Sequence, residues 1–353
     1  SHQEKQIKNS AKKYRIRLAN RITTCNRQNR GKIKDNMKIV ILESLGISDT
    51  EFNLITKPLA DHGHELIAYT DGKLDDDTLK TRIKDADIIV IANTPLSGEV
   101  IDAAENLKYI SVAFTGFNHI DLDKCQEKGI KVSNAAGYST NSVAEITFGL
   151  IISLLRNIVP LEAVTRSGGT KDGYRQLDLK GKTLGIIGTG EIGGAVAKLG
   201  LAFGCKVIAY NRSEKPDLIS KGVEYKSLDD VLKNSDIVTL HTPLTPETQH
   251  LIDKDKLALM KTSSLLINTA VGPIVDNDAL AQALRNGTIA GAGLDRVDME
   301  PPVPADYPIL DAPNTVLLPH IGFATEEAMV RRAEITFENI VKWEKGEQEN
   351  TVL

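Results

Sequence analysis

The chain has 353 residues, of which 41% are hydrophobic and 25% charged, a composition typical of a globular protein long enough for two domains. No apolar run approaches the roughly 20 residues of a membrane-spanning helix, so we expect no membrane segment. The three cysteines, Cys25, Cys125 and Cys205, form no disulfide or metal-ligand pattern. We therefore expect no metal and a reducing, cytoplasmic location.

Charge is distributed unevenly along the chain. The net charge is −4, yet residues 1–36 contain 11 Lys and Arg against Glu4 and Asp35. The remainder is acidic, which argues against a nucleic-acid partner for the folded body. The basic leader is either an RNA-binding or transit segment, or a tag remnant or upstream segment before a start at Met37. Because a strand pattern begins at Lys38, we favour the second interpretation and expect residues 1–36 to be disordered.

Short apolar runs alternate with helical patterns over residues 37–136. Strands are predicted at 38–42, 65–69, 86–92, 109–114 and 130–133, and helices at 50–62, 76–84 and 121–128. This alternation predicts an α/β fold with a doubly wound parallel sheet. The segment contains no glycine-rich phosphate turn, so we expect a flavodoxin-like substrate domain without its own nucleotide.

A long apolar helix predicted at 141–156 carries the chain into a second lobe, and a polar surface arm follows at 166–179. Further strands are predicted at 184–187, 206–210, 223–225, 236–240, 263–267 and 290–294, with a last one at 315–318. Six strands with helices between most of them match a Rossmann unit. We expect this dinucleotide-binding domain to span 137–324.

The tail is predicted to be a helix from about Thr325, a good N-cap residue. Met329, Ala333, Phe337 and Ile340 recur at helical spacing. We interpret this helix as packing back on the first domain. The substrate domain would then be discontinuous, formed by 37–136 plus 325–353, and the ligand cleft would lie between the lobes.

The strongest local motif is a glycine-rich turn between the strand at 184–187 and the helix that follows it. Gly188 allows a tight turn, Gly190 leaves room for a pyrophosphate, and Gly193 lets the helix approach the sheet closely. The helix N-terminus would then face the phosphates. The alternative is a glycine-rich turn with a purely structural role.

Polar residues follow the carboxyl ends of the predicted strands, where ligands of such sheets bind. Asp295 closes the sixth strand of the second lobe, Glu300 stands in the loop after it, and His320 ends the last strand. A histidine with a carboxylate partner forms a general acid–base pair, although a lone histidine is more often structural. We expect His320 to be catalytic.

Together these motifs resemble the D-isomer-specific 2-hydroxyacid dehydrogenases over residues 37–353. The resemblance rests on GTGEIG at 188–193, HTPLTPET at 241–248, INTAVGPIVD at 267–276, AGLDRVDMEPP at 292–302 and LLPHIGFAT at 317–325. The loops AFTGFNHID at 113–121 and GYSTNSVAE at 137–145 are most similar to the glycerate dehydrogenase (hydroxypyruvate reductase) branch. Because no regulatory domain follows the closing helix, the long phosphoglycerate dehydrogenases are a poorer match.

The resemblance implies hydride transfer between a nicotinamide cofactor and a small D-2-hydroxy acid or 2-keto acid. His320, held by Glu300, would exchange a proton with the substrate oxygen. The backbone N–H groups of Thr115 and Gly116 would bind the substrate carboxylate. The family also implies a homodimer formed through the 141–156 helix and the 166–179 arm.

The resemblance further implies a set of cofactor-binding residues. Asp295 would bind the nicotinamide carboxamide. The other residues lining the dinucleotide would be Glu191, Ile192, Thr242, Pro243, Thr248, Thr269, Ala270 and Val271.

One departure from the family concerns catalysis. The family has an arginine where this chain has Val271, and an aliphatic side chain cannot replace a bidentate guanidinium. The chain instead has Arg296 directly after Asp295, on what we expect to be the neighbouring strand. Either Arg296 supplies the guanidinium, or it points to solvent or pairs with Asp298 and turnover is impaired. The second reading keeps a non-catalytic dinucleotide sensor or corepressor-like protein as the alternative function.

A second departure concerns the cofactor. The family has an acidic residue at the end of the second strand, where it binds the ribose hydroxyls of NAD. This chain has Asn211 there, followed by Arg212 and Ser213. A neutral residue followed by a guanidinium suits a 2′-phosphate, so NADP(H) is favoured and NAD(H) remains open.

Several other side chains have weaker signals. Phe114, Phe117 and Leu96 either make the substrate pocket apolar or belong to the core. His119 would shape the substrate loop, and His241 would belong to the cofactor loop rather than act as a catalyst. His62 and His64 form a loop pair for which we do not expect metal binding.

Overall fold

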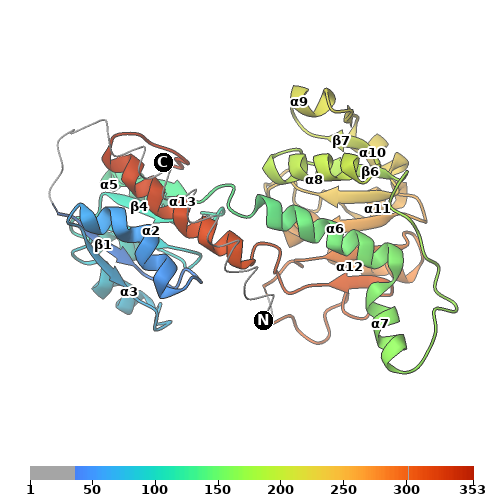
Figure 1. The fold of residues 1–353 in the computed structure, drawn as a ribbon, viewed down its shortest axis with the longest axis horizontal. Coiled ribbons are helices and arrows are strands. Elements are labelled where there is room, and N and C mark those ends of the chain that lie inside the picture. Colours follow the sequence, from blue (N-terminus) through green and yellow to red (C-terminus); the bar gives the residue numbers. More distant parts are fainter. Residues whose placement is uncertain (1–35, 301) are drawn as a thin grey trace, which may run out of the picture.

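The computed structural model describes residues 36–300 and 302–353. These residues form two lobes of parallel-sheet α/β architecture joined by a narrow waist (Figure 1). The expected disorder of the leader concerns residues that, except for Asn36, lie outside the described part of the chain.

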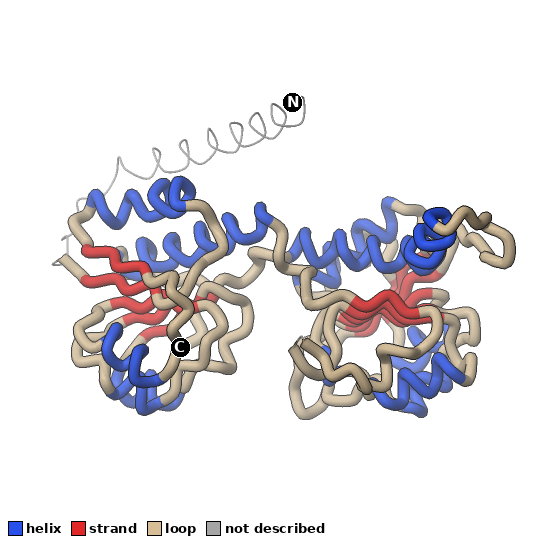
Figure 2. The backbone as a smooth tube through the Cα atoms, turned by 90° about the horizontal axis from the view of Figure 1, so that it is seen from below, coloured by secondary structure: helices blue, strands red, loops and turns tan. Residues whose placement is uncertain are grey.

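The first lobe is built on a five-stranded parallel sheet in the order β2-β1-β3-β4-β5. Its strands are β1 (Lys38–Ile41), β2 (Glu65–Ala68), β3 (Ile88–Ile91), β4 (Tyr109–Val112) and β5 (Lys131–Asn134). Every residue of β3 and β4 is buried because helices cover both faces of the sheet (Figure 2). This order confirms the flavodoxin-like prediction.

Helices from both ends of the sequence cover that sheet. They are α2 (Asp49–Asp61), α3 (Asp76–Ile83), α4 (Gly98–Asp102), α5 (Leu122–Lys128) and α13 (Glu326–Glu344). The predicted cap is confirmed, since the hydroxyl of Thr325 accepts the N–H of Ala328 over 3.1 Å. Phe337 and Ile340 of α13 belong to the same hydrophobic cluster as Ile39 and Val90 of the sheet. The first lobe is thus assembled from two distant stretches of the chain.

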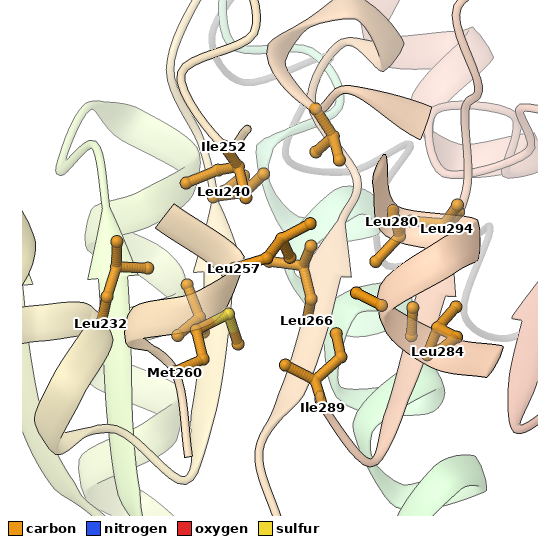
Figure 3. Close-up of a cluster of buried hydrophobic side chains, with 14 of the residues drawn as sticks. Leu232, Leu240, Ile252, Leu257, Met260, Leu266, Leu280, Leu284, Ile289 and Leu294 are labelled. Carbon is orange, nitrogen blue, oxygen red and sulfur yellow. The ribbon is translucent and has the colours of Figure 1, made fainter. Parts of the chain in front are cut away.

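The second lobe contains a seven-stranded parallel sheet in the order β12-β11-β10-β9-β6-β7-β8. Its strands are β6 (Thr183–Ile187), β7 (Lys206–Tyr210), β8 (Glu224–Tyr225), β9 (Ile237–Leu240), β10 (Leu265–Asn268), β11 (Gly291–Leu294) and β12 (Thr315–Leu317). The first six have the Rossmann order, and β12 extends that sheet at the β11 edge. Leu240, Leu266 and Leu294 from three adjacent strands form the centre of its core (Figure 3).

The second lobe carries its helices on both faces of the sheet. They are α6 (Thr140–Arg156), α7 (Ile158–Arg166), α8 (Glu191–Ala202), α9 (Pro216–Ile219), α10 (Leu228–Asn234), α11 (Lys254–Leu259), the 3₁₀ turn η1 (Gly272–Ile274) and α12 (Asn277–Arg285). The sequence did not predict α7. Asn157 (φ 51°) separates this helix from α6, and none of its residues is buried. Among the described residues, no single helix is long and apolar enough to cross a membrane, and only α6 and α7 taken together, bent by 58°, meet that criterion.

Two segments connect the lobes, one before α6 and one before α13 (Figure 2). They are tied together, because the hydroxyls of Ser142 and Thr325 lie 3.1 Å apart and Arg331 donates to the carbonyl of Tyr138 over 2.9 Å. The Phe114 ring, after β4, and the Phe323 ring, after β12, are 5.5 Å apart. The carboxyl ends of the two sheets therefore meet at the waist.

Candidate active site

His320, Glu300 and Arg296 form a connected group at the carboxyl end of the second sheet. Nδ1 of His320 lies 2.9 Å from Oε2 of Glu300, and Oε1 of Glu300 pairs with Nη2 of Arg296. Burial alone would raise the pKa of Glu300, but the hydrogen bond and charge of His320, together with the Arg296 guanidinium, lower it. Glu300 is thus a carboxylate that holds a histidine and an arginine at once.

The backbone around His320 is held by Asp295. Its two carboxylate oxygens accept the N–H groups of Ile321 and Gly322, each over 2.8 Å, and its carbonyl accepts the N–H of His320 over 2.8 Å. His320 itself has φ 58°, a left-handed conformation that is uncommon for a residue with a side chain and often occurs at functional sites. No sequence pattern indicated this positioning role of Asp295.

Val271 and Arg296 follow neighbouring strands, as expected. Asn268 of β10 is in register with Leu294 of β11. A Cβ atom on Gly272 would overlap the backbone of Val297, so the two loops are in direct contact. Arg296 neither points freely to solvent nor pairs with Asp298.

The side chains around Arg296 form a pocket. Asp298 is engaged by the hydroxyl of Tyr307. Arg296 and His320 both line a pocket of about 250 Å³ whose other walls include Leu294 and Leu317. The Nε atom of Arg296 is buried and has no hydrogen-bond partner among the described residues. That N–H is therefore a donor that lacks an acceptor.

The loop after β4 presents backbone donors at the waist. Thr115 and Gly116 are exposed, and their N–H groups make no hydrogen bond to any described residue. The side chain of Asn134 fixes this loop by donating to the carbonyl of Thr115 over 2.7 Å, a contact that the sequence did not suggest. The Phe323 ring contacts both His320 (4.9 Å) and Phe114 (5.5 Å) edge to face.

One predicted substrate residue is misplaced. Leu96 is fully buried in the core of the first lobe, where its N–H donates to the carbonyl of His119 over 2.8 Å. A side chain with no exposed surface cannot contact a substrate, so its assignment to the pocket was wrong. Phe117 is half-buried and Phe114 packs at the waist, so both remain candidates.

The glycine turn after β6 has the geometry of a dinucleotide cradle. Gly188 has φ 93°, and a Cβ there would lie 2.6 Å from the carbonyl oxygen of His241. A Cβ on Gly193 would overlap the carbonyl oxygen of Gly188, whereas one on Gly190 would meet no atom within 4 Å. The three glycines therefore provide the turn, the close helix approach and the open space that a pyrophosphate needs.

Unsatisfied polar atoms lie beside the same turn. The hydroxyl of Thr242 and Nε2 of His241 are buried without a hydrogen-bond partner among the described residues. Burial lowers the pKa of His241 to about 3, so its ring is neutral. These orphaned atoms and the free N–H groups at the start of α8 fit a bound dinucleotide.

The other predicted cofactor residues lie along the same edge of the sheet. Glu191 and Ile192 open α8, while Thr242, Pro243 and Thr248 follow β9. Thr269, Ala270 and Val271 follow β10. Some of their polar groups already have structural roles: Thr248 donates to the carbonyl of Pro243 over 2.7 Å, and the hydroxyl of Thr269 lies 2.9 Å from that of Thr147.

Asn211 follows β7 and closes the turn from the other side. Its side-chain oxygen accepts the N–H of Thr189 over 3.2 Å, and its amide donates to the carbonyl of Ser213 over 2.6 Å. Arg212 and Ser213 are exposed beside it. The edge where a ribose would lie thus presents an amide and a guanidinium but no carboxylate on this loop.

His62, His64 and Glu344 form one cluster of potential metal ligands in the described chain, within 4.8 Å of one another. Nδ1 of His64 accepts the N–H of Met37 over 3.1 Å, so the proton resides on Nε2, which lies 2.8 Å from Glu344. The contacts with Met37 and Glu344 thus engage both ring nitrogens of His64.

Comparisons with known proteins agree with this geometry. Residues 148–322 match the family model described as D-isomer specific 2-hydroxyacid dehydrogenase, NAD binding domain. The chain is 42% identical over 273 residues to a glyoxylate reductase of Thermofilum pendens, covering 75% of this chain and 80% of that protein. It is 35% identical over 324 residues to a hydroxypyruvate reductase of Blautia hydrogenotrophica, covering 90% and 99%.

A solved structure leads to the same family. The D-lactate dehydrogenase of Aquifex aeolicus, in complex with NAD and lactic acid, superposes with a TM-score of 0.75 at 34% identity, covering 89% of this chain and 98% of that one. Sequence, fold and site thus converge. The chain belongs to the D-isomer specific 2-hydroxyacid dehydrogenase family and is a hydroxyacid oxidoreductase that binds a nicotinamide cofactor.

Proposed function

We propose that this protein reduces a small 2-keto acid, such as glyoxylate, hydroxypyruvate or a bulkier analogue, to the D-2-hydroxy acid, with His320 as the general acid. The observation that carries the proposal is the 2.9 Å contact between Nδ1 of His320 and Glu300. It leaves Nε2 to donate a proton to the substrate oxygen, and the carboxylate stabilises the imidazolium between turnovers. In the reverse direction the same nitrogen accepts the hydroxyl proton.

The nicotinamide cofactor, when bound, supplies the hydride. The turn at 188–193, Asp295 and the loops after β9 and β10 would hold it. We infer a preference for NADP(H) over NAD(H), supported by Asn211 and the exposed Arg212, because a guanidinium pairs with a 2′-phosphate and a carboxylate at that place would repel it.

Arg296 would take the role of the guanidinium that Val271 cannot supply. The contact between their two loops and the unpartnered Nε–H of Arg296 support this assignment. One N–H is used by Glu300, and the remaining donors would polarise the ketone or bind the carboxylate. The N–H groups of Thr115 and Gly116 would hold the other side of that carboxylate, with Phe117 lining the pocket.

The alternative of a non-catalytic sensor has no support. A binding protein does not need a histidine oriented by a carboxylate, and the relatives compared are named as reductases. We retain the enzyme as the proposed function.

The test is a spectrophotometric assay that follows reduced-cofactor absorbance. NADPH and NADH are each offered with glyoxylate, hydroxypyruvate, pyruvate and a branched keto acid. We expect turnover with a higher kcat/KM for NADPH, lost in His320→Gln and kept in the exposed control His250→Asn. Silence across the panel while NADPH still binds would contradict the proposal.

We further propose that the protein is a cytoplasmic homodimer. Two observations support a dimer through α6 and α7: α7 buries none of its residues, and its Ile158 and Val159 are 50% and 55% exposed. Light scattering of the wild-type protein should give twice the mass of the chain. The Ile158→Asp variant should give the mass of a single chain. A monomeric wild type would contradict the dimer.

A further inference from the structure

The two N–H groups of the proposed carboxylate site belong to consecutive peptide units. A trans peptide is planar, and its N–H points in the opposite direction to its C=O. The N–H of Thr115 shares a peptide with the carbonyl of Phe114, and the N–H of Gly116 shares one with the carbonyl of Thr115. The donor that binds each carbonyl therefore determines the direction in which the N–H of that peptide points.

Both carbonyls are bound from the β5 side, but by different kinds of donor. The Phe114 carbonyl accepts the backbone N–H of Ala135 over 2.9 Å, a contact that continues the parallel pairing of β4 with β5. The Thr115 carbonyl accepts the side-chain amide of Asn134 over 2.7 Å. The first contact is available to any residue with a backbone N–H, whereas the second requires a donor on the side chain at position 134. Both N–H groups consequently point away from β5.

The second peptide has little other restraint. Thr115 and Gly116 are exposed, and a Cβ on Gly116 would find only a ring atom of Phe114, at 3.9 Å, among the described residues beyond its chain neighbours. Glycine adopts conformations that other residues avoid, so the peptide before it can rotate by about half a turn between two turn types. With its carbonyl unbound, the rotated peptide would direct the oxygen of Thr115 to where the N–H of Gly116 now points.

Asn134 is itself held from two directions. Its carbonyl accepts the side-chain amide of Asn339 on α13 over 2.9 Å, and its N–H donates to the carbonyl of Asn350 over 3.1 Å. The two supporting residues are joined, because the side-chain amide of Asn350 donates to Oδ1 of Asn339 over 3.0 Å. Asn134 and Asn339 are only 9% and 2% exposed. A connected polar network of this kind rigidifies its members and strengthens each hydrogen bond in the chain.

We propose that Asn134 is a positioning residue for substrate binding, whose amide fixes the Thr115–Gly116 peptide so that the N–H of Gly116 meets the substrate carboxylate. This inference rests on the proposed function and adds a residue to it. Asn134 acts through the peptide and not on the reacting atoms. Without its amide, the rotated peptide would present a carbonyl oxygen to an anion, so the site would lose a donor and gain a repulsion.

Asn134→Ala removes the donor without introducing a charge. Because a carboxylate contact is made equally in the ground and transition states, its loss raises KM and leaves kcat largely unchanged. We expect KM for glyoxylate to rise at least about tenfold and kcat to change less than about threefold. The Kd for NADPH, which we assign to the second lobe, should not change. A purely structural role would lower the melting temperature without this split between KM and kcat.

The failures of the two proposals are distinguishable. A wild-type KM in Asn134→Ala, or a loss of kcat at unchanged KM, would overturn the role of Asn134 alone. Absence of turnover of every keto acid by the wild-type protein would contradict the proposed function itself.

Asn134→Asp is an isosteric variant that contains its own rescue. An ionised carboxylate cannot donate to the Thr115 carbonyl, whereas a protonated carboxyl group can. The ratio of its KM to that of the wild type should be high at pH 8 and should fall toward one as the introduced group is protonated. Asn53→Asp, the same change at an exposed position on α2, is the matched control and should keep a ratio of one throughout. A raised ratio that does not respond to pH would show that the donor is not what matters.

Discussion

The Oε2 atom of Glu300 lies 2.9 Å from Nδ1 of His320, while its Oε1 atom is paired with Arg296. One carboxylate therefore orients both the proposed general acid and the proposed guanidinium. The positions of His320 and Arg296 therefore both depend on Glu300, an exposed loop residue.

Replacing Glu300 by glutamine should affect turnover more than binding. The amide keeps the shape but no longer stabilises an imidazolium or pairs with Arg296, so we expect kcat to fall about 10²-fold. KM for the keto acid should change less than threefold. Steady-state kinetics with NADPH measure both. A wild-type kcat would show that the contact is not used in catalysis.

The arginine relocation can be tested by reversing it. Arg296→Val should lower kcat/KM by about 10²–10³ because a polarising guanidinium is lost. The double variant Val271→Arg/Arg296→Val returns the guanidinium to the adjacent loop, which contacts 297–298 through Gly272. The kcat/KM of this double variant should be at least tenfold higher than that of Arg296→Val. Undiminished activity in the single variant would refute the role of Arg296.

The cofactor preference should depend on the residue after β7. Asn211→Asp places a carboxylate where a 2′-phosphate would lie, so KM for NADPH should rise at least about tenfold and KM for NADH should fall. Arg212→Ala should weaken NADPH alone. Lys198→Ala on the outer surface of α8 serves as the control and should change neither. If the wild-type protein prefers NADH, the inferred preference for NADP(H) is wrong.

Two adjacent glycines in α8 should respond in opposite ways to alanine. A Cβ on Gly193 would overlap the carbonyl of Gly188, whereas one on Gly194 would meet Leu218 at 3.9 Å, an ordinary contact. Gly193→Ala should therefore destabilise the fold by about 3 kcal/mol or more. Gly194→Ala should stabilise it by about 0.5–1 kcal/mol, since alanine is the better helix former. Urea unfolding distinguishes them, and equal effects would argue against the close helix approach.

Stability should fall as the pH drops below about 6.5. Burial lowers the pKa of His241 to about 3, so between these values the unfolded chain binds a proton that the folded chain does not. The loss is at most about 1.4 kcal/mol per pH unit for this residue. Burial lowers the pKa of His64 and His119 as well, which adds to the slope in the same direction.

The variant His241→Asn measures how much His241 contributes to the pH dependence of stability. The stability difference between pH 7.5 and 5.0 should shrink by about 2 kcal/mol in His241→Asn. His250→Asn, at an exposed position with φ 51° that asparagine tolerates, should leave it unchanged. An identical pH slope in both variants would contradict the buried neutral state of His241.

Much of this structure follows from local patterns. The apolar runs at β3 and β6 and the turn at 188–193 predict their own strands and helix, because burial on both faces and a phosphate turn each leave a distinct residue pattern. The missed elements are α4, a five-residue helix too short to show a helical period, and α7, a nine-residue helix interrupted by Pro160.

The site was predictable in composition but not in contacts. His320 and Glu300 were expected to meet, whereas the pairing of Arg296 with Glu300 and the hold of Asp295 on the next loop depend on three-dimensional packing. The assignment of Leu96 to the substrate pocket was wrong because a position near the substrate loop does not reveal which way an apolar side chain points.

The return of α13 to the first lobe also has a consequence for how the protein is made. Synthesis proceeds from the N-terminus, so β1 to β5 leave the ribosome long before Phe337 and Ile340, which cover Ile39 and Val90. The second sheet, contiguous from β6 to β12, has all its strands earlier than that. The lobe that is translated first is therefore completed last, and until then Ile39 and Val90 lack the cover that α13 provides.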